Sequence, residues 1–348
     1  HAPITGAAPL PASFSAAAQL YPNFVNGKGG INGRKLKVVV ANDEYRPATA
    51  VQVCQELVQQ AKAFLLVGGG GTDQIQACGR YAESAGVPYL SAGVTENGLR
   101  GLKGYFAVSM SYAQQGPMLA NLIKKEFPDR AGAAAMVYSE TPNFRDARDA
   151  FVKSLDGVEE YRLARTPSAT QLAATAQNLC IDGVKVAYPL MAPADWLKLL
   201  GSVRCDIQWV GVGLTMGLNT VANTGCKSSA EQIDGAIFFS PFPGTDKAPS
   251  MDPEFAAAVK GKNWDDIYVA LWATTKPIGE LIRKAGQNLT RAGFVQGAES
   301  TQNLSTGLNP VLSFSPQDHF GASQVHVLQA QCSGGGGSYK TIATFARY

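Results

Sequence analysis

Two short glycine-containing segments could bind an anion without using a charged side chain. Residues 68–73 (GGGGTD) follow a β-rich run and precede a helical pattern, and residues 91–95 (SAGVT) follow the next run. Glycine lets the backbone approach a ligand closely, and the first backbone N–H groups of a helix attract negative charge. Together with the hydroxyls of Thr72 and Thr95, they would form a carboxylate receptor. The alternative interpretation is a pair of tight turns.

The glycine-rich segments do not match the motifs that bind nucleotides. A dinucleotide fingerprint needs a third glycine, and Asp73 or Gln74 stands in its place. Residues 334–341 (GGGGSYKT) imitate a P-loop, but Tyr339 occupies the required glycine and the segment joins no strand to a following helix. We therefore expect no nucleotide cofactor.

Catalytic and metal-binding patterns are missing from the sequence. Neither G-x-S-x-G nor H-E-x-x-H occurs, and no Cys/His pair has zinc spacing. The carboxylate pairs at 43–44 and 265–266 are more typical of loops and helix starts than of acid–base catalysis. We expect neither an enzyme nor a metal site.

Composition narrows the class of protein. The chain has 348 residues, enough for two domains of ordinary size. A net charge of +3, with no long basic block, gives no footprint for nucleic acid. No apolar run approaches the roughly 18–20 residues that span a bilayer. Six cysteines without a C-x-x-C motif favour an oxidising compartment, with free thiols as the alternative.

The elements that would position these residues follow a βαβ rhythm. Short β-rich runs alternate with helical patterns such as those at 51–61, 73–85, 169–180 and 193–203, which predicts two α/β units in tandem. Strands are expected at 36–40, 64–67, 88–90, 105–108, 133–138, 184–188, 207–212 and 235–240. Candidate hinges are 114–116 and 241–244.

The two ends of the chain depart from this rhythm. Helices are predicted at 253–259, 265–285 and 290–300 without strands between them. They precede an antiparallel hairpin of 325–330 and 339–345 around a loose glycine-rich loop. At the start, a loop and a helix come first, so we expect the usual first strand of a doubly wound unit to be missing.

The chain resembles the type I periplasmic binding proteins of the leucine/isoleucine/valine-binding group, which deliver solutes to ABC importers. The similarity is carried by residues 26–36 (NGKGGINGRKL), 42–47, 85–90, 114–117 and 308–321. It implies an α/β fold of two doubly wound lobes with three crossovers and the ligand in the inter-lobe cleft. The lobes would be 1–113 with 243–321, and 114–242 with 322–348.

The resemblance also implies binding residues, position by position. Thr72, with Gly71 beside it, takes the place of a hydroxyl residue that holds the ligand's main-chain groups. Gly93 and Thr95 take the places of a backbone carbonyl and a second hydroxyl. The other ligand positions fall on Leu10, Tyr112, Phe144, Met191 (or Ala192) and Gly213.

Two acidic positions that meet an amino acid's ammonium group in this family fall on Gly213 and near Tyr112. Burying an ammonium group without a counter-charge costs several kcal/mol. We therefore expect a small carboxylate with an apolar or aromatic body rather than an α-amino acid. Its anion would bind Thr72, Thr95 and helix N–H groups. Its body would pack on the side chains of Leu10, Tyr112, Phe144 and Met191.

The six cysteines gain positions from the same comparison. Cys54 and Cys78 resemble a bridge in the amino-acid binders. Cys180 and Cys205 both lie just before neighbouring strands of the second lobe, and Cys226 and Cys332 remain for a third bridge. Buried free thiols are the alternative.

The implied protein is exported, either periplasmic or on the cell surface, with or without a lipid anchor. Its partners would be a small-molecule carboxylate and an ABC transporter permease, and it would be a monomer. Three alternatives stay open: a ligand-sensing receptor module of the same fold, a branched-chain amino-acid binder with rearranged ammonium contacts, and an enzyme on a doubly wound fold.

Overall fold

The chain forms two units, which it enters and leaves at three crossovers. The computed structural model describes residues 1–6, 10–213 and 215–348. The first unit contains His1–Met110 and Pro241–Val325, and the second contains Ser111–Ser240 and His326–Tyr348. The expected fold class of two α/β lobes with three crossovers is thereby confirmed. Within the described residues, no helix combines the length and apolar composition that crossing a bilayer requires.

The crossovers lie a few residues from the expected boundaries, for local reasons. Ser111 belongs with the second unit because it caps helix α5 (Tyr112–Glu126): its Oγ accepts from the Gln114 N–H at 3.1 Å, and its own N–H donates to Gln114. The predicted hinge at 114–116 therefore lies inside a helix. Ala322 stays with the first unit because it bridges to Leu312.

The first unit is built on a small parallel sheet. Strands β1 (Leu66–Gly68), β2 (Tyr89–Ser91) and β3 (Tyr105–Ala107) pair in that order. The first pass supplies helices α1 (Phe14–Ala18), α2 (Leu20–Gly27), α3 (Pro47–Gln59) and α4 (Thr72–Ser84). The second pass supplies α10 (Ala248–Met251), α11 (Pro253–Val259), α12 (Asp266–Lys284) and α13 (Arg291–Glu299).

The strand expected at 36–40 is not formed. A strand needs a neighbour for its N–H and C=O groups, and the parallel bridge that follows this segment, between Ala2 and Asn42, lies outside residues 36–40. The Ala2 N–H donates to the Ala41 oxygen at 3.1 Å, and the amino group of His1 donates to Val67 O at 2.7 Å. His1 and Ala2 thus lie between residues 41–42 and β1. They occupy part of the position where the first strand of a doubly wound unit would lie.

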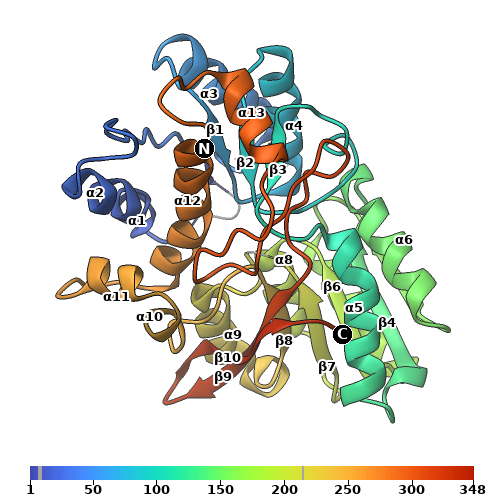
Figure 1. Ribbon diagram of the computed structural model, residues 1–348. Helices are drawn as coiled ribbons and strands as arrows, with labels where there is room; N and C mark the ends of the chain where they lie inside the picture. The colour runs from blue at the N-terminus through green and yellow to red at the C-terminus, as the bar shows by residue number, and fades with distance from the viewer. Residues whose placement is uncertain (7–9, 214) are drawn as a thin grey trace. The chain divides into compact units, whose positions relative to one another are not determined.

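The second unit contains a seven-stranded sheet in the order β10-β9-β8-β7-β6-β4-β5. Its parallel strands are β4 (Ala134–Ser139), β5 (Glu159–Leu163), β6 (Val186–Leu190), β7 (Gln208–Val212) and β8 (Ile237–Ser240). Figure 1 shows β8, β7, β6 and β4 side by side. The helices are α5, α6 (Arg145–Ser154), α7 (Ala169–Ile181), α8 (Pro193–Leu200) and α9 (Asn219–Ile233), with the short 3-10 turns η1 (Ala131–Ala133) and η2 (Pro142–Phe144).

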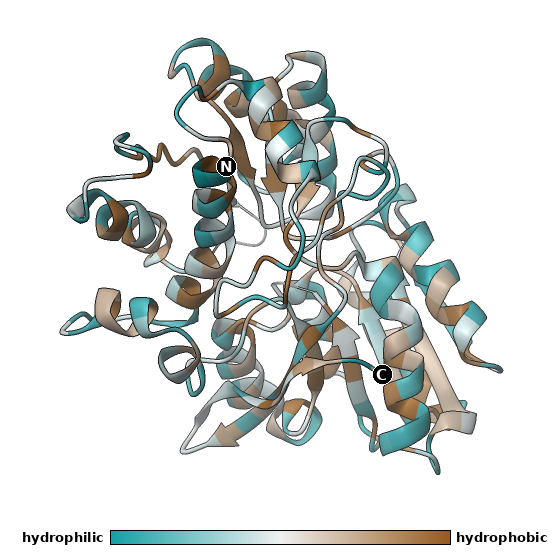
Figure 2. Cartoon of the chain, in the orientation of Figure 1, coloured by the Kyte–Doolittle hydropathy of each residue, from teal (hydrophilic) through white to brown (hydrophobic). Residues whose placement is uncertain are grey.

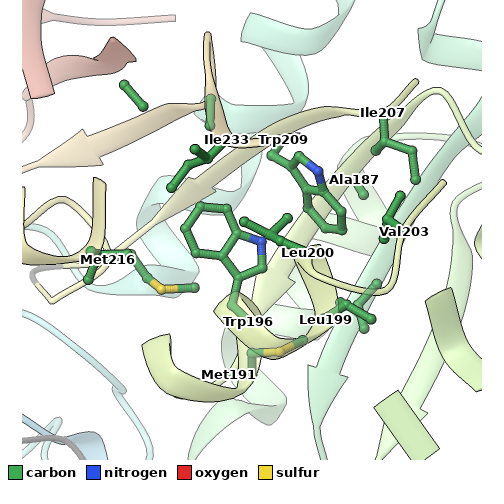
Figure 3. Packing of buried hydrophobic residues seen from close by; sticks show 14 of the residues in the cluster. Ala187, Met191, Trp196, Leu199, Leu200, Val203, Ile207, Trp209, Met216 and Ile233 are labelled. Atoms are coloured by element: carbon green, nitrogen blue, oxygen red, sulfur yellow. The ribbon is translucent and has the colours of Figure 1, made fainter. Parts of the chain in front are cut away.

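The helices cover the two faces of this sheet. Phe151 of α6 packs edge-on against Tyr188 of β6, with ring centroids 5.0 Å apart. On the opposite face, Trp196 of α8 packs against Trp209 of β7 at 6.1 Å (Figure 3). Figure 2 shows hydrophilic and hydrophobic residues mixed along α5 and α6, as expected for helices with one buried side.

Strands β9 (Val325–Ser333) and β10 (Gly336–Ala346) form the expected hairpin, but the connection is tight rather than loose. β9 pairs antiparallel with β8. Gly334 and Gly335 have φ values of 56° and 81°. Two consecutive positive φ angles characterise the two-residue turn that matches the twist of a hairpin.

The three predicted disulfides are confirmed: Cys54–Cys78, Cys180–Cys205 and Cys226–Cys332. The first joins α3 to α4 in the first unit, and the other two lie within the second unit. Each bridge therefore connects residues of one unit.

Candidate functional site

The two glycine-containing segments of the first unit emerge at the same sheet edge. β1 and β2 pair in parallel with Gly68 opposite Ser91, so the chain leaves both strands at the same level. Ser91 is fully buried, and its Oγ lies 2.8 Å from the Tyr105 hydroxyl of β3. The strand ends are therefore held in register beneath the two loops, as the sequence predicts.

The segment after β1 is shaped by its glycines. A Cβ at Gly70 would contact the Pro3 ring at 2.8 Å, and one at Gly71 would collide with the Gln74 side chain. Gly71 caps helix α4 with extended backbone, and the Ile75 N–H donates to Gly71 O at 3.0 Å. Thr72 is the first helical residue and is buried. The helix thus begins directly after the glycine-rich segment, with its first N–H groups outside its internal hydrogen bonds.

The segment after β2 is fixed by contacts with residues 109 and 110. The Gly93 N–H donates to Ser109 Oγ at 2.6 Å, and a Cβ at Gly93 would collide with the Met110 carbonyl oxygen. Thr95 is fully buried, and its Oγ1 accepts from the Asn97 N–H at 3.1 Å. Gly93 and Thr95 are therefore fixed by local packing.

Leu10 is half-buried and lies near the glycine-rich segment. Its backbone N–H donates to Pro3 O at 2.9 Å. Its Cδ1 would lie 3.8 Å from a Cβ placed on Gly70. Leu10 and residues 68–72 thus occur together in the first unit.

In the second unit, Tyr112 and Gly213 come together. Tyr112 is the first residue of α5, and Gly213 follows β7. A Cβ at Gly213 would lie 3.5 Å from the Tyr112 hydroxyl. The φ of Gly213 is 131°, which favours glycine. An acidic side chain at this position would therefore strain the backbone.

Phe144 and Met191 have different environments. Phe144 ends the 3-10 turn η2 and is half-buried. Met191 is 5% exposed and belongs to the hydrophobic core cluster, near Trp196 in Figure 3. The structure gives Met191 a packing role, and its contribution to a ligand stays a prediction.

Some polar residues near these positions were missed by the sequence analysis. Ser139 ends β4, Thr141 and Asn143 follow it, and Asp146 lies in the first turn of α6. Burial, together with nearby Tyr112 and Asp146, raises the pKa of the Tyr188 phenol well above its ordinary value. The strand-end rule, applied to the second unit as well as the first, would have drawn attention to Ser139.

Two carboxylates that were interpreted as loop or helix-start residues have structural partners. Asp43 is fully buried and lies 2.7 Å from the His1 imidazole, whose other nitrogen lies 2.8 Å from the Tyr89 hydroxyl. Asp265 caps α12 by accepting from the Ile267 N–H at 3.1 Å. Asp265 thus has the helix-start role expected, whereas Asp43 is not solvated.

One group of potential metal ligands occurs among the described residues. Atoms of His1, Cys54 and Cys78 lie within 4.8 Å of one another. Both sulfurs belong to the Cys54–Cys78 disulfide, so neither is a thiolate. The group is therefore not a metal-binding set in this oxidised state.

Comparisons with known proteins agree on the fold. A family model described as "Periplasmic binding protein" matches residues 2–337. An "Amino acid binding protein" of Pseudomonas aeruginosa is 35% identical over 101 residues, which is 28% of this chain and 27% of that relative.

Two solved structures show the same fold at low sequence identity. The branched-chain amino acid substrate-binding protein LivJ of Streptococcus pneumoniae, in complex with isoleucine, has a TM-score of 0.78 and 18% identity, covering 98% of this chain and 97% of that one. A solute-binding protein of an ABC transporter from R. palustris, in complex with 4-hydroxybenzoate, has a TM-score of 0.78 and 15% identity, covering 99% and 95%.

Proposed function

The chain belongs to the family of periplasmic binding proteins, and from this we propose that it is the extracytoplasmic solute-binding protein of an ABC importer. We further propose that its ligand is a small carboxylate with an apolar or aromatic body. The observation that carries the proposal is the edge of the first unit's sheet, where α4 begins at Gly71–Thr72 after β1 and the buried Thr95 follows the paired strand β2. Binding without turnover is the expected activity.

The proposed site for the anion end of the ligand consists of neutral groups. The first N–H groups of a helix lie outside its internal hydrogen bonds and carry a partial positive charge. Thr72 and Thr95 add hydroxyls at the ends of two strands that are aligned through Gly68 and Ser91. Hydrogen bonds to a charged group are stronger than neutral ones, which suits a carboxylate.

The residues proposed to contact the other end of the ligand favour an uncharged body. Gly213 holds the place where the family resemblance puts an acid, and its φ of 131° disfavours any side chain there. Tyr112 stands at the second acidic position and offers a ring and a neutral hydroxyl. The R. palustris relative, which was solved with 4-hydroxybenzoate, is an example of this ligand class on the same fold.

One observation favours a second candidate, an amino acid bound through rearranged contacts. Asp146 contributes to the raised pKa of the Tyr188 phenol, so the second unit does offer a carboxylate near Tyr188. The S. pneumoniae relative was solved with isoleucine. In this alternative, Asp146 would meet the ammonium group.

Isothermal titration calorimetry distinguishes the two candidates. Benzoate-like acids should bind at micromolar strength, while leucine and isoleucine give no heat. Thr72→Ala should weaken the acids about tenfold or more, because a hydrogen bond to an anion is lost. Asp146→Asn should leave them unchanged. Micromolar leucine binding that Asp146→Asn abolishes, without heat from the acids, would establish the second candidate instead.

A further inference from the structure

The strand order of the second unit places a topological switch point at the carboxyl end of β4. Strand β5 lies on one side of β4 and β6 on the other, so successive connections leave in opposite directions. In open α/β sheets, the crevice outside the strand ends at such a point is where ligands bind. β4 ends at Ser139, and β6 ends one residue before Met191.

Two buried hydroxyls at this point lack partners. Ser139 is 3% exposed, and neither its Oγ nor Thr141 Oγ1 has a hydrogen-bond partner among the described residues. Buried polar groups in native proteins are almost always hydrogen-bonded. These hydroxyls therefore call for a partner that the described residues do not supply.

The backbone holds the two hydroxyls on one side of the segment. The Glu140 N–H donates to Leu163 O of β5 at 2.8 Å, which continues the pairing past the end of β4. Thr141 has extended backbone, with φ −134° and ψ 148°. Side chains two residues apart in an extended segment share a side, so Ser139 and Thr141 are arranged to contact one group.

The chemistry of the pair fits a neutral hydroxyl group. Each hydroxyl both donates and accepts, and neither carries a charge. Glu140, between them, is exposed and paired with Arg162 at 2.9 Å, so its charge is balanced at the surface. A ligand hydroxyl can donate to one of these side chains and accept from the other, so a single neutral substituent satisfies both.

We propose that Ser139 and Thr141 form a subsite for a hydroxyl substituent of the ligand. This inference rests on the proposed function and narrows its substrate class to hydroxylated carboxylic acids with an apolar or aromatic body. The two residues then determine specificity, while the carboxylate is bound elsewhere.

The test compares ligands that differ by one hydroxyl. Calorimetry measures benzoate, 3-hydroxybenzoate and 4-hydroxybenzoate against the full chain. The wild type should bind one of the hydroxybenzoates about tenfold more tightly than benzoate. Ser139→Ala and Thr141→Val should each reduce this preference about threefold to fivefold and leave benzoate affinity unchanged. Thr141→Ser keeps the hydroxyl and should keep the preference.

Each other outcome decides against the subsite. Equal weakening of all three acids in folded variants, checked by thermal unfolding, would assign the residues a structural role. No change in any affinity would mean that ordered water satisfies the hydroxyls. A wild type without preference for either hydroxybenzoate would also overturn the subsite but keep the proposed function. A wild type that binds none of the acids would overturn both.

Discussion

Gly93 illustrates how a residue that is predicted to bind the ligand can also be required by the fold. The family resemblance gives its carbonyl a role in holding the ligand. The structure adds that its N–H donates to Ser109 Oγ at 2.6 Å and that the Met110 carbonyl oxygen occupies the space of a Cβ. The loop that carries Thr95 can therefore pass over the β3 end only with glycine at this position.

Gly93→Ala should lower the free energy of unfolding by about 2 kcal/mol, because overpacking against backbone atoms cannot be relieved by a rotamer change. Urea unfolding measures the difference. Gly132→Ala is the matched control, since an added Cβ there has nothing within 4 Å, and it should change stability by no more than about 0.5 kcal/mol. Equal stability of the two variants would contradict the close packing at Gly93.

At the scale of single residues, the sequence predicts features that depend on neighbouring positions better than contacts between positions far apart in the chain. Thr72 could be placed at a helix start because the glycine-rich turn and the helical pattern adjoin it. The partner of Asp43 could not be foreseen, since His1 is 42 positions away. The packing of Met191 in the core was equally hidden, because a resemblance assigns a position without assigning a side-chain environment.

Strands and helices were predicted correctly where the sequence periodicity is local. The predictions failed where an element depends on a neighbouring strand. Most βαβ strands form within one or two residues of the expected ranges. Residues 36–40 have the composition of a strand but a single bridge nearby, at Asn42, and do not become one. The hairpin connection was expected to be loose because six consecutive small residues suggest a flexible loop. In the structure, β9 and β10 include four of them, and only Gly334 and Gly335 form the turn.

The hairpin turn gives a prediction at the scale of the element. Gly334 has a φ of 56° and open space where a Cβ would be, so substitution there reports backbone strain alone. Gly334→Ala should destabilise the chain by about 1 kcal/mol. Gly334→Asn should cost less, because Asn tolerates positive φ and suits this turn. Thermal unfolding compares them, and equal losses would mean that the turn does not require positive φ.

The molecule as a whole is organised by discontinuous segments. Dividing the length by a typical domain size would split the chain into two continuous halves. Each unit instead consists of two separate stretches of chain. The number of crossovers could be inferred only from the family resemblance, although the Pro- and Gly-containing candidate hinge at 241–244 adjoins the boundary at Ser240. The short-range capping by Ser111 then sets the first boundary.

The disulfides follow this organisation. Cys180–Cys205 closes a sequence separation of 25 within the first pass through the second unit. Cys226–Cys332 closes a separation of 106 and joins that pass to the final hairpin, so its loop encloses the whole second pass through the first unit. Longer loops lose more entropy when closed in the unfolded chain.

Removing the long-range bridge should therefore cost more than removing the short one. On loop entropy, Cys226→Ala with Cys332→Ala should lower the free energy of unfolding by about 4–5 kcal/mol, and Cys180→Ala with Cys205→Ala by about 3–4 kcal/mol. Calorimetry measures the total loss of stability in each double variant, and hydrogen exchange shows which residues lose protection. In both double variants, peptides from residues 111–240 and 326–348 should exchange faster, while those from 1–110 should not. Equal losses would contradict the entropic argument. Faster exchange in 1–110 would show that the bridges stabilise more than the unit that contains them.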